Sequence, residues 1–293
     1  MTTPAPESRY VQTNGIRLHY LAFGDAGPPL VIIHGNTHSG GTYAPLAARL
    51  ASDFTVYAVD LRGHGLSDKP DSYSWRAFRD DVVGLLDQLD LRDAIIVAHS
   101  RGGGITLLTA AARPDRVRGV VAYEPTMPAQ MSQPDVSDAA AEDRATTLVA
   151  RAERRRSAFA SREEMYNHFH GRGAFKDWRD EFLHAFVEHA AIDSEGGGVE
   201  LASPTRIEAL LYRAMTDTSE WQALSPSDVP VLAVYGENGG RLGPDRDPVA
   251  AVRALFPNTS MQVIAKATHS GPMEQPERFE ALIREFAKSL GKN

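Results

Sequence analysis

The sequence contains no cysteine among its 293 residues. A disulfide framework, a zinc site with cysteine ligands and a thiol nucleophile are therefore excluded. Basic residues are fewer than acidic ones. The chain has 31 Lys and Arg and 38 Asp and Glu, which gives a formal net charge of −7. The one basic cluster, RAERRR at 151–156, includes an acidic residue and fits a solvated helix face. A nucleic-acid partner, which needs a dense basic stripe, is not expected.

Long hydrophobic runs are missing as well. Apolar residues make up 42% of the chain, which is enough for a sizeable core, but no segment approaches the roughly 18 uninterrupted apolar residues of a membrane span. The first residues, MTTPAPESRY, lack the basic and apolar regions of a signal peptide. We therefore expect a cytoplasmic protein with no membrane partner, built from one core and one insertion.

Short apolar runs predict a series of buried strands. Residues 9–23 read as a hairpin turning at Asn14-Gly15, and further strands are expected at 30–33, 54–59, 95–98, 117–123, 231–235 and 261–265. Helical patterns lie between them, at 42–51, 75–91, after residue 100, at 248–256 and at 276–290. This alternation predicts a parallel sheet with right-handed crossovers and an antiparallel edge.

The alternation stops for about a hundred residues. Residues 126–227 show helical patterns at 142–160, 162–169, 177–191 and 204–215, a turn at 195–198 and no strong strand. We interpret this segment as a helical cap inserted into the core. The predicted organisation is therefore 1–125 core, 126–227 cap and 228–293 core.

The stretch IIVAHSRGGG at 95–104 reads as a strand, a sharp turn and a helix centred on Ser100. Ala98 and Gly102 flank it, and small residues are needed there because larger side chains would collide across so tight a bend. The order small-x-Ser-x-small matches a nucleophile elbow.

Several motifs in the right order give the chain a resemblance to the α/β-hydrolase family over nearly its whole length. They are His34-Gly35, Asp60-x-Arg62-Gly63-x-Gly65-x-Ser67, the Ser100 elbow and Thr268-His269. The resemblance implies an α/β fold with a mostly parallel eight-stranded sheet, helices on both faces, an inserted helical cap and no cofactor. Asp60 and Arg62 are expected to hold the fold together.

In such a site the serine hydroxyl needs a base, because almost no alkoxide forms at neutral pH. His269 is the candidate, in a loop that we expect to be flexible enough to swing its imidazole over Ser100. Backbone N–H groups of Arg101 and Asn36 are the expected oxyanion donors. His-Gly-Asn resembles haloalkane dehalogenases, but those enzymes use an aspartate nucleophile, so dehalogenation is not expected here.

The third member of the triad departs from the common family pattern. Many relatives carry an aspartate three residues beyond the glycine that ends the seventh strand, where this chain has Gly239. Glu124 follows a strand directly and looks like the acid position of haloalkane dehalogenases and of the zearalenone lactonase. A carboxylate is needed to orient the histidine and to balance the imidazolium. Asp245 or Asp247 remains the alternative.

The expected function is cofactor-free serine hydrolysis of a carboxylic ester or lactone through an acyl-enzyme, with a small molecule as the partner. Carbon–carbon bond hydrolysis of a β-diketone-like substrate, and ligand binding on a hydrolase scaffold, remain alternatives. Histidines without carboxylates at ligand spacing predict no metal site, and a homodimer is left open. Cap aromatics are expected to line the substrate pocket: Phe169, Phe175, Trp178, Phe182, Tyr212 and Trp221.

Overall fold

The computed structural model describes residues 5–133, 135–242 and 247–291. Within these residues, eight strands form one sheet in the order β1-β2-β4-β3-β5-β6-β10-β11. Only the β1–β2 and β2–β4 pairs are antiparallel. The strands are β1 (Glu7–Thr13), β2 (Ile16–Phe23), β3 (Pro29–Ile33), β4 (Thr55–Val59), β5 (Ala94–His99), β6 (Val117–Tyr123), β10 (Val231–Gly236) and β11 (Thr259–Ile264). The mostly parallel eight-stranded sheet is thus confirmed.

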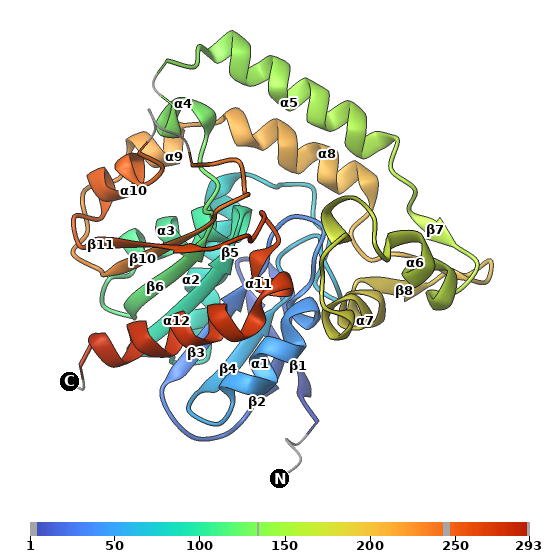
Figure 1. The fold of residues 1–293 in the computed structure, drawn as a ribbon, viewed down its shortest axis with the longest axis horizontal. Coiled ribbons are helices and arrows are strands. Elements are labelled where there is room, and N and C mark those ends of the chain that lie inside the picture. The colour runs from blue at the N-terminus through green and yellow to red at the C-terminus, as the bar shows by residue number, and fades with distance from the viewer. Residues whose placement is uncertain (1–4, 134, 243–246, 292–293) are drawn as a thin grey trace.

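The central strands are buried on both faces because helices cover each side of the sheet (Figure 1). Leu30 and Ile32 of β3 point to the face covered by α1 (Ala44–Leu50) and α12 (Pro276–Ser289). Val31 and Ile33 point to the opposite face, covered by α2 (Trp75–Gln88), α3 (Arg101–Ala112) and α10 (Ala250–Leu255). This arrangement explains why the strand sequences are continuously apolar instead of alternating.

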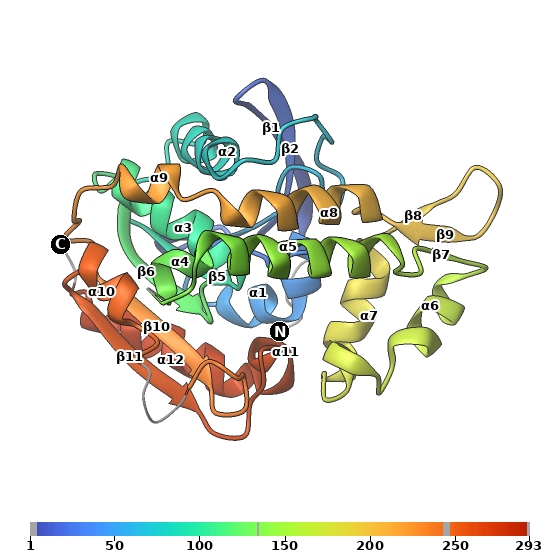
Figure 2. The same ribbon diagram turned by 90° about the horizontal axis from the view of Figure 1, so that it is seen from above.

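The segment between β6 and β10 runs over the carboxyl ends of the strands, with its two main helices side by side (Figure 1, Figure 2). Its helices are α4 (Ala129–Ser132), α5 (Asp138–Glu153), α6 (Arg162–Phe169), η2 (Gly173–Phe175), α7 (Asp180–His189), α8 (Thr205–Arg213), η3 (Ala214–Thr216) and α9 (Ser219–Gln222). Two short helices belong to the core: η1 (Gly40–Tyr43) before α1 and α11 (Gly271–Glu274) before α12. Residues 126–227 thus occupy the expected place of a cap, and their independence as a domain stays a prediction.

The cap is not wholly helical, which corrects the expectation of a helical cap with no strong strand. Three strands, β7 (Ala158–Phe159), β8 (Ala191–Asp193) and β9 (Val199–Leu201), form a small antiparallel sheet. The β8–β9 hairpin turns at Gly197 and Gly198, which have φ of 88° and 79°. Strands of two or three residues are too short to produce a readable alternation, so the sequence pattern missed them.

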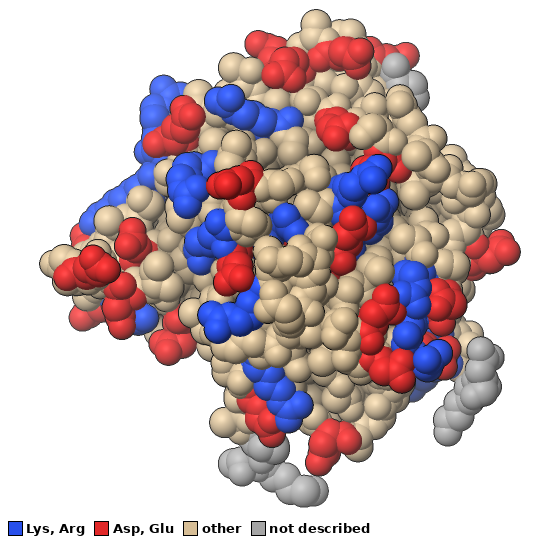
Figure 3. Space-filling view, turned by 180° about the vertical axis from the view of Figure 1, so that it is seen from behind, with Lys and Arg blue, Asp and Glu red and all other residues tan. Residues whose placement is uncertain are grey.

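Charged side chains of both signs intermingle on the face drawn in Figure 3. Among the described residues, no helix combines the length and apolarity that crossing a bilayer requires.

Candidate active site

Ser100 lies at the sharp turn between β5 and α3, where its backbone adopts φ 55° and ψ −123°. This positive φ is strained for a residue with a side chain. The turn needs glycine at 102, because a Cβ there would stand 2.5 Å from the His34 carbonyl oxygen. The predicted strained elbow is therefore confirmed, and it holds the Ser100 side chain at the carboxyl edge of the sheet.

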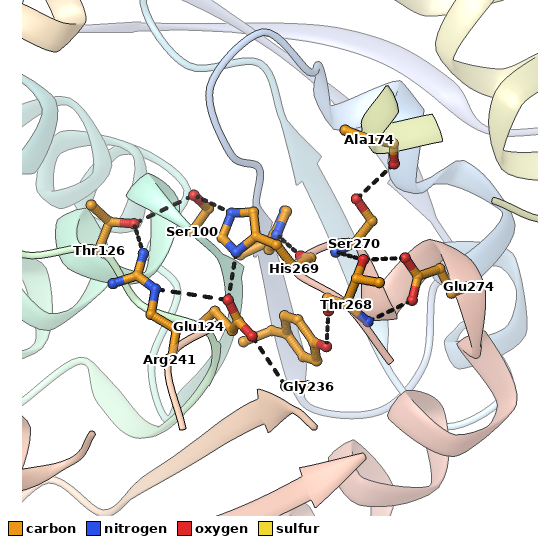
Figure 4. A network of polar contacts seen from close by, with 12 residues as sticks. Ser100, Glu124, Thr126, Ala174, Gly236, Arg241, Thr268, His269, Ser270 and Glu274 are labelled. Atoms are coloured by element: carbon orange, nitrogen blue, oxygen red, sulfur yellow. Dashed lines mark hydrogen bonds and ion pairs between the residues drawn. The ribbon is translucent and has the colours of Figure 1, made fainter. Parts of the chain in front are cut away.

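His269 lies in the loop between β11 and α11, and its imidazole faces the serine (Figure 4). Its Nε2 is 3.0 Å from Ser100 Oγ, which is hydrogen-bonding distance. The His269 side chain is 43% exposed, so the imidazole is accessible from the solvent side. Nucleophile and base candidates separated by 169 residues in sequence thus meet in direct contact.

Glu124 directly follows β6, the strand next to the elbow strand. Its carboxylate is completely buried, and Oε2 lies 2.6 Å from His269 Nδ1. The backbone N–H of Gly236 donates to Oε1 at 3.2 Å. The structure therefore brings Ser100, His269 and Glu124 together as a continuous chain of contacts.

The surroundings of Gly239 explain why a residue with a side chain does not fit at this position, where many relatives carry the triad aspartate. A Cβ on Gly239 would stand 1.7 Å from Glu124 Oε1, so the glutamate carboxylate occupies the volume that a side chain at 239 would need. Of the alternative acids, Asp247 accepts hydrogen bonds from Val249 N–H and Arg253, at 3.0 and 2.9 Å, on the surface. Asp245 lies outside the described residues.

The loop that carries His269 is held at several points, contrary to the expected freedom to swing. The Tyr123 hydroxyl donates to the Thr268 carbonyl at 2.6 Å, and the Thr268 N–H donates to Glu274 at 2.8 Å. His99 Nε2 lies 2.8 Å from the His269 carbonyl. These contacts come from β5, β6 and α11, elements that the loop sequence itself could not reveal.

His99, the residue before the serine, was not identified by sequence reasoning. Because a carbonyl oxygen can only accept, His99 Nε2 must carry the proton that it donates to His269. Its Nδ1 must then accept from the Tyr43 hydroxyl, 2.8 Å away. Burial, with nearby His269 and His38 adding to it, lowers the pKa of His99 well below its usual value. His99 is thus a neutral link between η1, the elbow and the His269 loop.

Of the two predicted oxyanion donors, Arg101 follows Ser100 directly and Asn36 follows Gly35, which lies close to the serine. Arg101 is the first residue of α3, and the first N–H groups of a helix have no carbonyl partner within it. Gly35, next to Asn36, lies so close that an added Cβ would be 3.2 Å from Ser100 Cβ. Asn36 Oδ1 is buried without a hydrogen-bond partner within the described ranges. The placement fits the predicted role, which remains a prediction.

The Arg101 side chain has a structural role that is separate from the predicted oxyanion role of its backbone N–H. Its guanidinium is buried and lies 4.3 Å above the Trp75 ring. It donates to the Leu211 carbonyl of α8 at 2.9 Å and to the Tyr73 carbonyl at 3.4 Å. Burial lowers its pKa to about 9. The side chain therefore ties the elbow helix to the cap.

Two further residues beside the serine escaped the sequence reasoning. Thr126 Oγ1 lies 3.4 Å from Ser100 Oγ. Arg241 donates a hydrogen bond to Thr126 Oγ1 at 3.3 Å. Arg241 Nε is also 3.8 Å from Glu124 Oε2. Neither residue stands in a recognisable motif, and their proximity depends on how β6 and β10 pair in the sheet.

The predicted pocket-lining aromatics fall into separate groups. Phe169, Phe175 and Trp178 form one cluster with Phe182 and Phe186 against the core. Trp178 contacts the His38 ring, which stacks on His99 beside the serine, at centroid distances of 5.3 and 5.8 Å. The Tyr212 hydroxyl donates to Glu208 at 3.2 Å, and burial raises its pKa to about 12.

Trp221 lies elsewhere, since its ring is 1% exposed and packs edge-on against Trp75 of α2 at 5.5 Å. Its contacts are with the core and not with the cluster of Phe169, Phe175 and Trp178. A role in lining the pocket remains a prediction for all of these aromatic residues.

The polar residues of the predicted motifs at 34–35 and 60–67 serve as internal supports. Arg62 donates to the buried Asp81 at 2.6 Å, and Asp60 accepts the Gly40 N–H at 2.7 Å. His34 Nε2 accepts the Leu61 N–H at 3.0 Å, and burial lowers the pKa of His34. No group of three or more potential metal ligands occurs in the part of the chain that the structure describes.

The chain is similar in sequence to known hydrolases and to a haloalkane dehalogenase. Over a limited region the chain is 42% identical to the 2-(acetamidomethylene)succinate hydrolase of Mesorhizobium japonicum, across 118 residues that are 40% of this chain and 42% of that protein. It is 34% identical to a haloalkane dehalogenase of Agrobacterium fabrum over 136 residues, 43% of this chain and 44% of that one. These matches span less than half the length of the relatives.

Solved structures match over almost the entire chain. The crystal structure of E-2-(acetamidomethylene)succinate hydrolase superimposes with a TM-score of 0.79 and 28% identity, covering 97% of this chain and 99% of that one. The thioesterase domain from the curacin biosynthetic pathway has a TM-score of 0.77 at 19% identity, over 96% and 100% of the two chains, which shows a shared fold. Residues 28–276 also match the family described as alpha/beta hydrolase fold. Together with the sheet order, the elbow and the cap, this match shows that the chain belongs to the α/β-hydrolase family.

Proposed function

We propose that this protein is a serine hydrolase that cleaves a carboxylic ester or lactone through an acyl-enzyme. The observation that carries the proposal is the contact chain from Ser100 Oγ through His269 to the fully buried Glu124, with distances of 3.0 and 2.6 Å. Nucleophile, base and orienting acid then stand in the order that acyl transfer requires.

In the first half of the reaction, Ser100 Oγ attacks the substrate carbonyl carbon and its proton passes to His269 Nε2. The Glu124 carboxylate accepts a hydrogen bond from His269 Nδ1–H and stabilises the imidazolium, while the N–H groups of Arg101 and Asn36 donate to the oxyanion. Collapse of this intermediate breaks the bond to the leaving oxygen, which takes the proton from His269. In a lactone, that alcohol stays attached to the acyl group.

In the second half, water attacks the acyl-enzyme and gives one proton to His269. The carbonyl–Oγ bond breaks, Ser100 recovers its proton and the carboxylic acid leaves. Apart from the attacking water, the groups that act on the substrate in these steps are Ser100, His269, Glu124 and the N–H groups of Arg101 and Asn36.

A second candidate is hydrolysis of an amide-linked acyl group at the same serine. It is favoured by the similarity to 2-(acetamidomethylene)succinate hydrolase, whose named substrate carries an acetamido group. An amide leaving nitrogen requires protonation by His269 before the bond breaks, so the contact chain serves both reactions. Carbon–carbon bond hydrolysis would use the same three residues and remains an alternative prediction.

A fluorophosphonate probe and a substrate panel test these proposals. We expect the probe to label wild-type protein at Ser100, and p-nitrophenyl esters of graded chain length or lactones to be hydrolysed faster than N-acyl anilides and β-diketones. Ser100→Ala should abolish both labelling and turnover while circular dichroism and Tm stay unchanged. Absence of labelling and of turnover in folded wild-type protein would instead favour a ligand-binding scaffold.

A further inference from the structure

We propose that Arg241 binds a carboxylate carried by the substrate, so that the preferred substrates are esters or lactones with an anionic group near the scissile carbonyl. This inference rests on the proposed function, because it assigns a substrate class to the same site. Sequence reasoning gave Arg241 no role, and the triad chemistry described above does not use its charge.

The position of Arg241 carries the first part of the argument. Its guanidinium lies 3.3 Å from Thr126 Oγ1, which is itself 3.4 Å from Ser100 Oγ. Figure 4 shows the guanidinium on the Thr126 side of His269, opposite Ser270 and Glu274. A group bonded to this guanidinium is therefore only a few bond lengths from a carbonyl attacked by Ser100.

The contact between Arg241 and Glu124 does not account for the arginine. Its Nε is 3.8 Å from Glu124 Oε2, beyond hydrogen-bonding distance, and that oxygen already contacts His269 at 2.6 Å. The Arg241 side chain remains 34% exposed. A guanidinium has five donors in a planar fork that matches a carboxylate, and the Thr126 hydroxyl accepts from one of its nitrogens.

Arg241 is one of the residues that line a groove. The groove has a volume of about 560 Å³, and its lining includes Pro125, Met127, Arg144, Tyr235 and Arg241. Pro125 directly follows the triad acid, so the groove starts beside the reaction centre. Its volume falls within the range of small-molecule sites, and Met127 and Tyr235 offer an apolar wall for a short carbon chain.

The charges on the groove favour an anion near Arg241. Arg144, exposed on α5, is a second guanidinium on the lining. Asp247 also lines the groove, but its carboxylate accepts from Arg253 and from the Val249 N–H, at 2.9 and 3.0 Å. Asp135, the other carboxylate among the lining residues that the structure describes, is exposed. Arg241 is the charged group of this set that also reaches Thr126 and Glu124.

The test compares kcat/KM for p-nitrophenyl hydrogen glutarate, which carries a carboxylate on its acyl chain, with that for neutral p-nitrophenyl butyrate. In Arg241→Gln we expect the ratio of the two values to fall roughly 10- to 100-fold, mainly through a higher KM for the charged ester. Arg241→Lys, which keeps the charge, should retain part of the ratio. Arg206→Gln, the same change at an exposed position of α8, is the matched control and should keep the wild-type ratio.

A second charged ester, 4-acetoxybenzoate, places the carboxylate on the leaving group. A loss confined to this ester in Arg241→Gln would assign the groove to the alcohol part, and a loss confined to the glutarate ester would assign it to the acyl part. An unchanged ratio for both charged esters in Arg241→Gln would overturn the inference while leaving the proposed function intact.

Binding provides a readout that does not depend on turnover. Glutarate should bind wild-type protein and Arg206→Gln with equal affinity in calorimetric titration, and Arg241→Gln at least 10-fold more weakly. If the wild-type protein hydrolysed no ester, the proposed function would fail, yet this titration would still decide the role of Arg241. Equal glutarate affinity in wild-type protein and Arg241→Gln would contradict that role.

Discussion

The sheet side and the cap side of the site are built in different ways. On the sheet side, Ser100, Glu124 and His269 each follow a strand, and hydrogen bonds link their side chains. On the cap side, Phe169, Phe175 and Trp178 contact one another and the core through rings. The reacting groups therefore depend on directional contacts with fixed distances, whereas the cap depends on non-directional packing that tolerates changes of shape.

This difference predicts how each side responds to change. Removing one polar partner on the sheet side should damage the rate of reaction and leave the fold intact. Removing a cap aromatic should alter selectivity or stability, according to what its ring contacts.

Glu124→Gln should produce the largest loss among changes that leave the nucleophile in place. The amide cannot balance an imidazolium, and by analogy with serine proteases we expect turnover to fall about 10⁴-fold. Asp247→Asn is the matched control because its carboxylate contacts Arg253 on the surface. Steady-state kinetics with Tm measurements decide the matter, and a normal rate for Glu124→Gln would refute the assignment.

Gly239→Ala should give the next largest effect. The new methyl would meet Glu124 Oε1, which stands 1.7 Å from the Cβ position, and would push the carboxylate away from His269. We expect kcat to fall roughly 10- to 100-fold, as misplacement of a catalytic group by about 1 Å does elsewhere. Gly196→Ala, where the added Cβ meets nothing within 4 Å, is the control. Equal rates for the two variants would show that Glu124 tolerates displacement.

Substitutions of Trp178 and Trp221 should distinguish cap aromatic residues that affect substrate selectivity from those that stabilise the fold. Trp178→Ala should change the chain-length preference for p-nitrophenyl esters by several-fold, because its ring contacts His38 beside the elbow. Trp221→Ala should lower the free energy of unfolding by about 3–5 kcal/mol, because its ring is buried against Trp75. A chain-length profile altered in Trp221→Ala and unchanged in Trp178→Ala would reverse this assignment.

Stability should fall as the pH drops below about 6.5, through histidines buried around the elbow. Burial lowers the pKa of four such histidines, and it lowers the pKa of His38 to about 3. At acidic pH these side chains are protonated in the unfolded chain and stay neutral in the folded state. The four are His34, His38, His64 and His99. Above the pKa of histidine in the unfolded chain, these side chains do not lower the free energy of unfolding. Below it, each histidine lowers the free energy of unfolding by up to about 1.4 kcal/mol per pH unit. Urea unfolding at pH 7.5, 6 and 5 measures this slope, and equal stability at all three values would contradict it.

Much of the fold could be predicted from the sequence because local patterns encode it. Apolar runs such as that of β3 predicted buried strands, and the small residues around Ser100 predicted the elbow. Gly239 at the common acid position pointed to Glu124, since both sit beside predicted strand ends. The strand and elbow inferences use residues that are neighbours in sequence, where spacing and side-chain size are directly readable, whereas the acid position comes from the family resemblance.

What escaped prediction depends on residues that only the folded chain brings together. The short cap strands exist because a glycine hairpin meets residues 158–159. His99 ties down the His269 loop across 170 positions, and Arg241 reaches Thr126 across 115.

By itself, then, the sequence determined the order of strands and helices and the elbow, because these follow from local periodicity and sterics, whereas His269 and Glu124 were predicted through its resemblance to the α/β-hydrolase family. The tertiary structure decided that Glu124 contacts His269, that Trp221 belongs to the core and that Arg241 contacts Thr126. Pairing of β6 with β10 and docking of the cap set these distances, and no local pattern specifies them.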